Sequence, residues 1–240
     1  MSLGLSIVHL YPELLQTYGD RGNVLALRRR LEWRGIAARV INVGRGDRLP
    51  SDADIVFIGG GSDRVQQAVF GEMKIRRPEV EDAAASGAVV LGICGGFQLL
   101  GHSYTDASGA AAEGMGLLDV TTVARSPRLV GRAVVEASFA GHQMKIVGFE
   151  NHGGRTFLGE GAVPLGRVLK GRGNNGEDGQ EGAVQGSVLG TYLHGPLLPS
   201  NPSLCDALLK AAFRRSPGQV LSPLDDRLEN TAHDAAMTRR

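Results

Sequence analysis

The chain of 240 residues has few cysteines and few lysines, and it carries almost no net charge. Its two cysteines, Cys94 and Cys205, exclude a disulfide framework and favour a reducing compartment, so we expect the cytoplasm. The 26 basic and 25 acidic residues exclude binding of nucleic acid or anionic lipid through bulk charge. The longest uncharged stretch, residues 83–101, is interrupted by glycines, which argues against a membrane span. The sequence therefore predicts a protein with no nucleic-acid partner and no membrane span.

Glycine and aliphatic residues are abundant instead. The 35 glycines cluster in short segments, and 42% of the chain is hydrophobic, enough for one sizeable core. No internal repeat or domain boundary is evident. We expect one domain over residues 1–221, followed by a polar tail at residues 222–240 that is either mobile or docks a partner.

Short apolar runs alternate with helical patterns in the first half of the chain. Strands are expected at residues 3–8, 36–43, 55–58 and 88–93, and Asp20 is placed to cap the first helix. The runs at 55–58 and 88–93 are wholly apolar, as in parallel strands that are covered on both faces. This alternation predicts the α/β class, with a largely parallel twisted sheet flanked by helices.

The second half of the chain contains mostly strand patterns. One further helix is expected at residues 203–214. We expect these strands to extend the sheet or to form an additional antiparallel layer. Two glycine-rich segments, 106–114 and 171–182, are expected to be surface loops. The expected strands are at residues 116–123, 129–138, 143–149, 183–189 and 191–193.

A cysteine stands where one of the apolar strands turns into a helix. Residues 92–96 read Gly-Ile-Cys-Gly-Gly, the pattern of a nucleophile elbow with cysteine in place of serine. The glycines on both sides relieve crowding in a sharp turn and let the thiol of Cys94 project from the sheet. The helix start favours a negatively charged thiolate. Cys94 is therefore a candidate nucleophile, and the competing interpretation is an inert buried thiol.

Two further segments can complete such a site. His194 follows an apolar strand and precedes a Gly-Pro break, which makes it the best candidate for a base, although many loop histidines are purely structural. The run Gly59-Gly60-Gly61 lies at a helix start, so the amides of Gly60 and Gly61 can form an oxyanion hole with the amide of Gly95. The competing interpretation of this run is a plain tight turn.

Cofactor patterns are absent or incomplete. Residues 171–176 match G-x-G-x-x-G, but acidic residues follow where a dinucleotide site needs a helix. No P-loop and no paired metal-ligand spacing occurs in the sequence. We therefore expect neither a metal nor a cofactor in this chain.

With Cys94, the glycine run and His194 in place, the sequence resembles the class I glutamine amidotransferases, which free ammonia from glutamine on a flavodoxin-like fold. Their nucleophile motif corresponds here to Gly92-x-Cys94-x-Gly96-x-Gln98. More narrowly, the sequence resembles the cobyric-acid-synthase-like branch and, within it, the glutaminase subunits of lipid II isoglutaminyl synthases. The segments that carry this resemblance are residues 18–23, 59–63, 149–154, 173–178 and 192–196.

The resemblance implies a function for several residues. Cys94 would form a thioester with L-glutamine, and His194 would move the protons. Arg128 would hold the substrate carboxylate, with Arg125 as the second choice, and Gln98 would line the pocket. The ammonia would pass to a Mur-ligase-like partner of the MurT type, which amidates the D-glutamate of lipid II. ATP and magnesium are expected on that partner and not on this chain.

One position departs from the family pattern. Most triad amidotransferases have a glutamate two residues after the histidine, and here that residue is Pro196. A histidine without an acidic partner is a poorer base, because neither its tautomer nor its ring direction is fixed. We hypothesise that the partner subunit supplies an acid to His194, so that the isolated chain is a weak glutaminase. Glu150 is an alternative within the chain.

Three other functions stay open from the sequence. The same glutaminase chemistry can serve corrinoid amidation, which differs only in the acceptor. The chain can also be a non-catalytic interaction subunit that retains the fold, or an unrelated thiol hydrolase of similar architecture.

Overall fold

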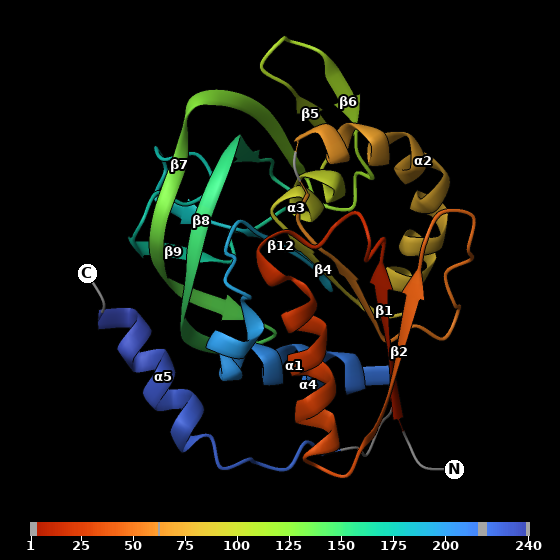
Figure 1. Ribbon diagram of the computed structural model, residues 1–240, viewed down its shortest axis with the longest axis vertical. Coiled ribbons are helices and arrows are strands. Elements are labelled where there is room, and N and C mark those ends of the chain that lie inside the picture. The colour runs from red at the N-terminus through yellow and green to blue at the C-terminus, as the bar shows by residue number, and fades with distance from the viewer. Residues whose placement is uncertain (1–3, 62, 216–219, 239–240) are drawn as a thin grey trace.

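The computed structural model describes residues 4–61, 63–215 and 220–238. The first of its two sheets has the strand order β11-β12-β4-β3-β1-β2 (Figure 1). All neighbouring strands in it are parallel except the β11-β12 hairpin, so the prediction of a largely parallel sheet is confirmed. The strands are β1 (Gly4–Leu10), β2 (Ala37–Val43), β3 (Ile55–Ile58), β4 (Val89–Ile93), β11 (Ala183–Gln185) and β12 (Val188–Thr191).

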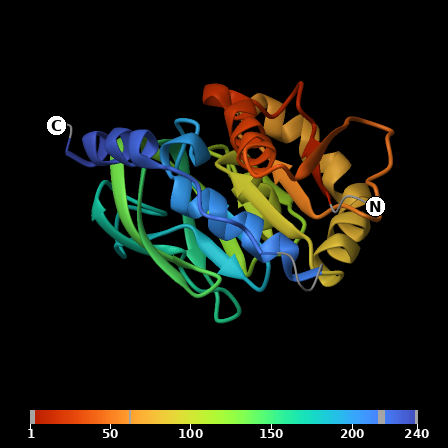
Figure 2. The same cartoon turned by 90° about the horizontal axis from the view of Figure 1, so that it is seen from below.

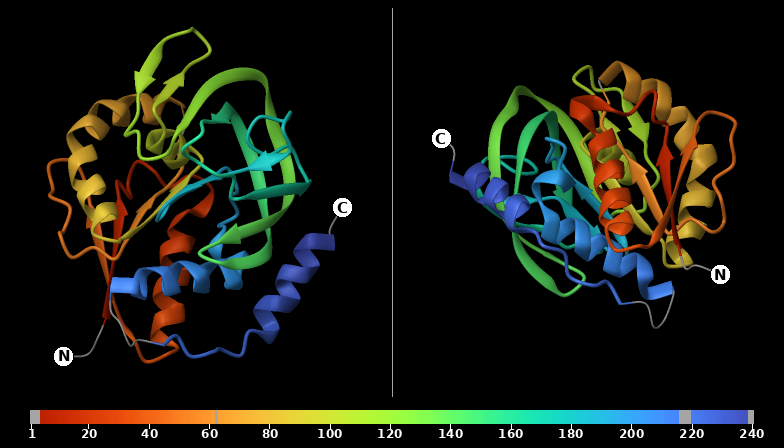
Figure 3. Two further views of the ribbon diagram at one scale, coloured as in Figure 1. Left: turned by 180° about the vertical axis from the view of Figure 1, so that it is seen from behind. Right: turned by 60° about the horizontal axis from the view of Figure 1, so that its bottom comes forward.

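Helices cover both faces of this sheet. Helices α1 (Arg21–Glu32) and α4 (Pro202–Ala212) lie on the face toward the viewer in Figure 1, and α2 (Asp63–Ala85) covers the other face, seen from behind in Figure 3. Every residue of β3 and β4 is buried, as their apolar composition predicts. No helix within the described residues is long and apolar enough to cross a lipid bilayer. The remaining helices are α3 (Gly95–Leu100), α5 (Arg227–Thr238), η1 (Thr17–Gly19), η2 (Leu198–Ser200) and η3 (Phe213–Arg215).

A second, mostly antiparallel sheet stands beside the first (Figures 1 and 2). The long strand β7 is central to it and pairs antiparallel to β8 and β9 and parallel to β5. The additional antiparallel strands predicted for the second half are thus present. The strands are β5 (Ser103–Thr105), β6 (Ala111–Glu113), β7 (Val120–Phe139), β8 (His142–Leu158), β9 (Gly166–Lys170) and β10 (Gln180–Glu181).

The strand boundaries differ from the prediction at several positions: β8 extends to Leu158, nine residues beyond the strand expected at 143–149, β12 ends at Thr191, and β9 was not expected. Two other differences change the number of strands. The expected strands at 116–123 and 129–138 are parts of one strand, β7, whose pairing with β8 shifts register between Ala124 and Leu129. The expected strand at 183–189 is instead a hairpin, because Gly186 turns the backbone at a φ of +61°. The first of these two differences depends on how β7 pairs with β8, and the second depends on a single backbone angle at Gly186.

The two expected surface loops also carry structure. The segment at 106–114 includes β6, which pairs with β5. In the segment at 171–182, Asn174, Asn175 and Glu181 are buried, and the side chain of Asn174 bonds the backbone of Gly182. This segment is therefore only partly a surface loop, since residues 173–175, 181 and 182 are buried whereas residues 176–179 are exposed.

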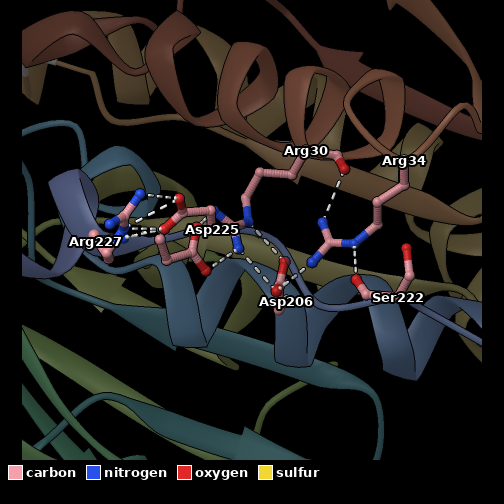
Figure 4. Close-up of polar contacts among 7 residues, drawn as sticks. Arg30, Arg34, Asp206, Ser222, Asp225 and Arg227 are labelled. Carbon is pink, nitrogen blue, oxygen red and sulfur yellow. Dashed lines mark hydrogen bonds and ion pairs between the residues drawn. The ribbon is translucent and has the colours of Figure 1, made fainter.

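Residues 222–226 of the tail lie beside α1 and α4, and α5 follows them (Figure 4). Arg30 binds Asp206 of α4 at 2.6 Å and Asp226 of the tail at 2.7 Å. Arg34 binds Asp206 at 2.6 Å and donates to the carbonyl of Ser222. Both arginine side chains are almost fully buried, so these pairs fasten the tail to the domain. A partner-docking role of the tail stays a prediction.

Candidate active site

Cys94 occupies a strained turn between β4 and α3. Its backbone has a φ of 50° and a ψ of −101°, which points the side chain out of the sheet edge. A Cβ at Gly92 would lie 2.7 Å from the backbone of Gly96, and a Cβ at Gly96 would lie 2.2 Å from the carbonyl oxygen of Ile58. The expected need for a glycine on each side of the nucleophile is therefore confirmed.

His194 follows β12 and is fixed to β8 by an isolated bridge. Its N–H donates to the carbonyl of Phe149 at 2.9 Å, and its own carbonyl accepts from Phe149 at 3.0 Å. A Cβ placed on Gly60 would lie 3.0 Å from Cε1 of His194 and 3.4 Å from Cβ of Cys94. The predicted nucleophile and base therefore lie on either side of Gly60, in one site.

Asp20 is a third member of this group, and sequence reasoning missed its position. It was expected to cap α1, but its side chain makes no capping hydrogen bond. Its Oδ2 instead accepts from the Gly60 N–H at 2.6 Å, and its Oδ1 lies 3.9 Å from Nδ1 of His194. The carboxylate is fully buried, so an acid of this chain already faces the imidazole.

Glu150, the alternative acid within the chain, has other partners. Its two carboxylate oxygens accept from the backbone amides of Arg172 at 2.7 Å and Gly173 at 2.9 Å. These amides belong to the G-x-G-x-x-G segment, so Glu150 occupies donors that a phosphate group would need. Neither oxygen of Glu150 is hydrogen-bonded to His194, so the structure does not favour this alternative, and an acid from a partner subunit stays a prediction.

The site favours a charged histidine. Burial by itself lowers the pKa of His194, but the carboxylate of Asp20 and the sulfur of Cys94 oppose this effect and raise the pKa to about 9. At neutral pH the ring is then an imidazolium beside the sulfur. Such a pair stabilises a thiolate, which is the nucleophilic form of cysteine.

The predicted oxyanion hole needs one correction. The amide of Gly60 donates to Asp20, so it is not available to an oxyanion. Gly95 is the first residue of α3, where a backbone N–H has no acceptor in a preceding turn. The amides of Gly61 and Gly95 remain the predicted donors.

A cavity of about 190 Å³ opens at the sulfur of Cys94. This volume is smaller than the several hundred Å³ of typical pockets for drug-sized molecules, so the cavity fits a small metabolite. Part of its lining comes from Thr17 and Tyr18 of η1, and part from β8. Polar side chains on its wall include Gln98, Arg128, Asn151 and His152.

Arg128 and Gln98 line this cavity, as the resemblance implied. The guanidinium of Arg128 donates from Nε to the side-chain oxygen of Asn151 at 2.9 Å and from Nη2 to its carbonyl at 2.8 Å. These bonds fix the plane of the group and leave its Nη1 edge for a carboxylate. Arg125 instead pairs with Glu177 and lies over the ring of Phe157. The structure therefore favours Arg128 over Arg125.

Several cavity residues had no assigned role in the sequence, among them Tyr18, Asn151 and His152. The amide of Asn151 donates to the hydroxyl of Tyr18 at 2.6 Å, and the ring of Tyr18 packs edge-on against His194. Gly154, beside them, has no room for a Cβ, which would lie 2.4 Å from Nε2 of Gln98. Only the motif segments at 18–23 and 149–154 pointed to these residues.

Comparison with known proteins agrees with this geometry. Residues 6–202 match the family model described as the CobB/CobQ-like glutamine amidotransferase domain. The chain belongs to this amidotransferase family.

Two similar amidotransferase subunits cover most of the chain. The lipid II isoglutaminyl synthase (glutamine-hydrolyzing) subunit GatD of Staphylococcus aureus (strain N315) is 43% identical over 212 residues, 88% of this chain and 85% of that protein. The subunit of the same name from Streptococcus pneumoniae (strain ATCC BAA-255 / R6) is 38% identical over 217 residues, 90% of this chain and 83% of its own length. Among solved structures, PurLQS from Thermotoga maritima matches 89% of this chain and 97% of its own with a TM-score of 0.56. At 20% identity this last likeness concerns the fold alone.

Proposed function

We propose that this amidotransferase chain is the glutaminase subunit of a lipid II isoglutaminyl synthase. It hydrolyses L-glutamine through a thioester on Cys94 and delivers ammonia to a MurT-like ligase subunit. The observation that carries the proposal is the meeting of the Cys94 thiol and the His194 ring around Gly60, with the sulfur at a small cavity. The similarity to GatD subunits over most of both chains supports the acceptor and the partner.

The cavity positions glutamine for attack. The free edge of the Arg128 guanidinium binds the substrate carboxylate, because Asn151 already holds the other edge. The side-chain amide of the substrate then extends toward Cys94, which lines the same cavity. Holding both ends of a short substrate in this way converts the attack into an intramolecular step.

The first half of the reaction releases ammonia. The Cys94 thiolate adds to the amide carbon, and the N–H groups of Gly61 and Gly95 stabilise the resulting oxyanion. The His194 imidazolium then gives its proton to the leaving nitrogen. The C–N bond breaks, so ammonia departs and a thioester and a neutral imidazole remain.

The second half restores the site. A water molecule gives a proton to the neutral His194 as its oxygen adds to the thioester carbon. The C–S bond breaks, glutamate leaves, and the thiolate and the imidazolium are formed again. Asp20 stabilises the imidazolium whenever it forms, since its carboxylate lies 3.9 Å from Nδ1.

The ligase half of the reaction belongs to the partner. ATP and magnesium bind to that subunit, which activates the α-carboxyl of the D-glutamate in lipid II and combines it with ammonia. We place the assembled enzyme in the cytoplasm, in keeping with the two free thiols of this chain.

The proposal is tested by ammonia release from glutamine. Cys94→Ala is expected to abolish release, whereas Cys205→Ala, which removes the fully buried second thiol, is expected to retain it. Glutamine is also expected to protect Cys94 from alkylation, which an unrelated thiol hydrolase would not show. Ammonia release by Cys94→Ala at the wild-type rate would refute a glutaminase and favour a non-catalytic subunit.

The acceptor is tested separately, with the ligase that co-purifies with the chain. Glutamine-dependent amidation of lipid II is expected in the complex and is expected to be lost with Cys94→Ala. Amidation of a corrinoid acid in place of lipid II would refute the acceptor but leave the glutaminase chemistry intact.

A further inference from the structure

The cavity wall contains a buried hydrogen-bond acceptor that no protein group uses. Nε2 of His152 is inaccessible to solvent and has no hydrogen-bond partner in the described part of the chain. His152 as a whole is 1% exposed and lines the same cavity as Cys94 and Arg128. A buried polar atom without a partner is costly, so its presence in a binding cavity indicates that a ligand satisfies it.

The chemical form of this atom follows from its neighbours. Nδ1 of His152 lies 2.8 Å from the carbonyl oxygen of Gly154, which can only accept, so Nδ1 carries the proton. Burial lowers the pKa of His152 to about 3, and nearby arginines act in the same direction. The ring is therefore neutral, and Nε2 presents a lone pair to an N–H donor.

The ring is also held in a fixed position. It stacks on Tyr192 with ring centroids 3.6 Å apart and planes within 6°. The Tyr192 hydroxyl is fixed in turn by Thr156 at 2.6 Å and by the amide of Gln98 at 3.0 Å. Nε2 is thus a preorganised acceptor, because the ring that carries it loses little conformational entropy when a ligand binds.

The position of His152 next to Arg128 indicates which donor it meets. Arg128 binds Asn151, the residue before His152, and its Nη1 lies 3.6 Å from a Cβ placed on Gly153, the residue after it. A carboxylate held by Arg128 has the α-ammonium of an amino acid on the adjoining carbon. That ammonium carries three N–H donors and no acceptor, which complements a lone pair.

We infer that Nε2 of His152 accepts a hydrogen bond from the α-ammonium of the substrate, and that His152 thereby selects free α-amino acids. The inference rests on the proposed glutaminase function and deepens it. An amide substrate without the α-amino group leaves the lone pair unpaired and is disfavoured.

The test compares L-glutamine with glutaramate, which has the same carboxylate and amide but no α-amino group. Hydrogen bonds to charged groups of this kind correspond to about 10- to 150-fold in kcat/KM, so the wild-type chain is expected to prefer glutamine by that factor. In His152→Phe, which keeps a ring on Tyr192 but has no acceptor, the preference is expected to fall toward one, mainly through a higher KM for glutamine. The matched control is His142→Phe, an exposed histidine on the same strand, which is expected to keep the wild-type preference.

Several outcomes would overturn the inference. The first is a wild-type preference for glutamine near one, and the second is an unchanged preference in His152→Phe. The third is a preference that is lost in Gln98→Met but kept in His152→Phe, because Oε1 of Gln98 is the other unpaired acceptor among the described residues of this cavity wall. If His152→Phe does not fold, His152→Leu provides the same comparison with a smaller side chain. A wild-type chain that releases no ammonia from glutamine, alone or with its ligase, would instead overturn the proposed function itself.

Discussion

Replacing Asp20 with asparagine removes one buried charge and retains the volume of the side chain. In the native site, the carboxylate lies 3.9 Å from Nδ1 of His194 and contributes to a pKa of about 9. The desolvation that remains in the variant favours the neutral ring. The sulfur of Cys94 still opposes this effect, so we expect the pKa of His194 in Asp20→Asn to fall toward its ordinary value of 6.5.

The size of the kinetic effect follows from these values. At pH 8, a group with a pKa of about 9 is about nine-tenths protonated, and a group at 6.5 is about 3% protonated. The fraction of sites with an imidazolium ready to protonate the leaving ammonia thus falls by up to about 30-fold. Loss of the fixed ring direction reduces kcat further, because the carboxylate also orients the imidazole.

The assay is the pH dependence of kcat/KM for glutamine hydrolysis between pH 6 and 10. The basic limb, which reports the loss of the imidazolium proton, is expected near 9 in the wild type and at least one unit lower in Asp20→Asn. Asp52→Asn, which removes an exposed carboxylate, is the matched control and is expected to leave the profile unchanged.

Two results would refute this reasoning. One is a basic limb that does not move in Asp20→Asn, with activity close to the wild type. The other is an isolated wild-type chain that is almost inactive and gains full activity only with its ligase subunit. The second result would favour the acid from the partner that the sequence suggested.

Three further predictions concern the cavity, the tail and the loss of folding stability at acid pH. Gly154→Ala places a Cβ 2.4 Å from a buried amide nitrogen, so kcat/KM is expected to fall at least about 10-fold, whereas Gly71→Ala, at an exposed glycine of α2 with no neighbouring atom within 4 Å of the added Cβ, is expected to retain activity. Asp226→Asn weakens a buried pair and is expected to lower the free energy of unfolding in urea by up to about 3 kcal/mol, whereas Asp225→Asn breaks an exposed pair and is expected to leave it unchanged. Burial and the charge of a nearby arginine lower the pKa of His9 to about 4, so its contribution to stability is lost as pH falls from 6.5 through 4. In His9→Gln the loss of stability between pH 7 and pH 5 is expected to be smaller by about 2 kcal/mol, and an equal loss in both proteins would contradict this assignment.

The parts of this protein that depend on a few adjacent residues can be read from the sequence. The elbow at Cys94 was predictable because a strand, a sharp turn and a helix follow one another within a short segment, and the glycines that the turn needs are in it. The parallel sheet was predictable for a similar reason, since wholly apolar runs such as β3 and β4 suit only a layer covered on both faces. The motif segments added the family and the choice of Arg128.

The arrangement around Gly60 was decided only by the tertiary structure. A carboxylate that begins a helix in the sequence has the pattern of a cap, and nothing local shows that Asp20 turns away from α1 toward Gly60 and His194. The same holds for Glu150, whose partners come from a loop that folds back onto its strand, and for the stacking of His152 on Tyr192. Local sequence determines backbone conformation over a few residues, because sterics and hydrogen bonds there act between neighbours. Contacts between distant segments depend on how all the strands and helices pack together, and it is this packing that brings the acid, the base and the nucleophile into one site.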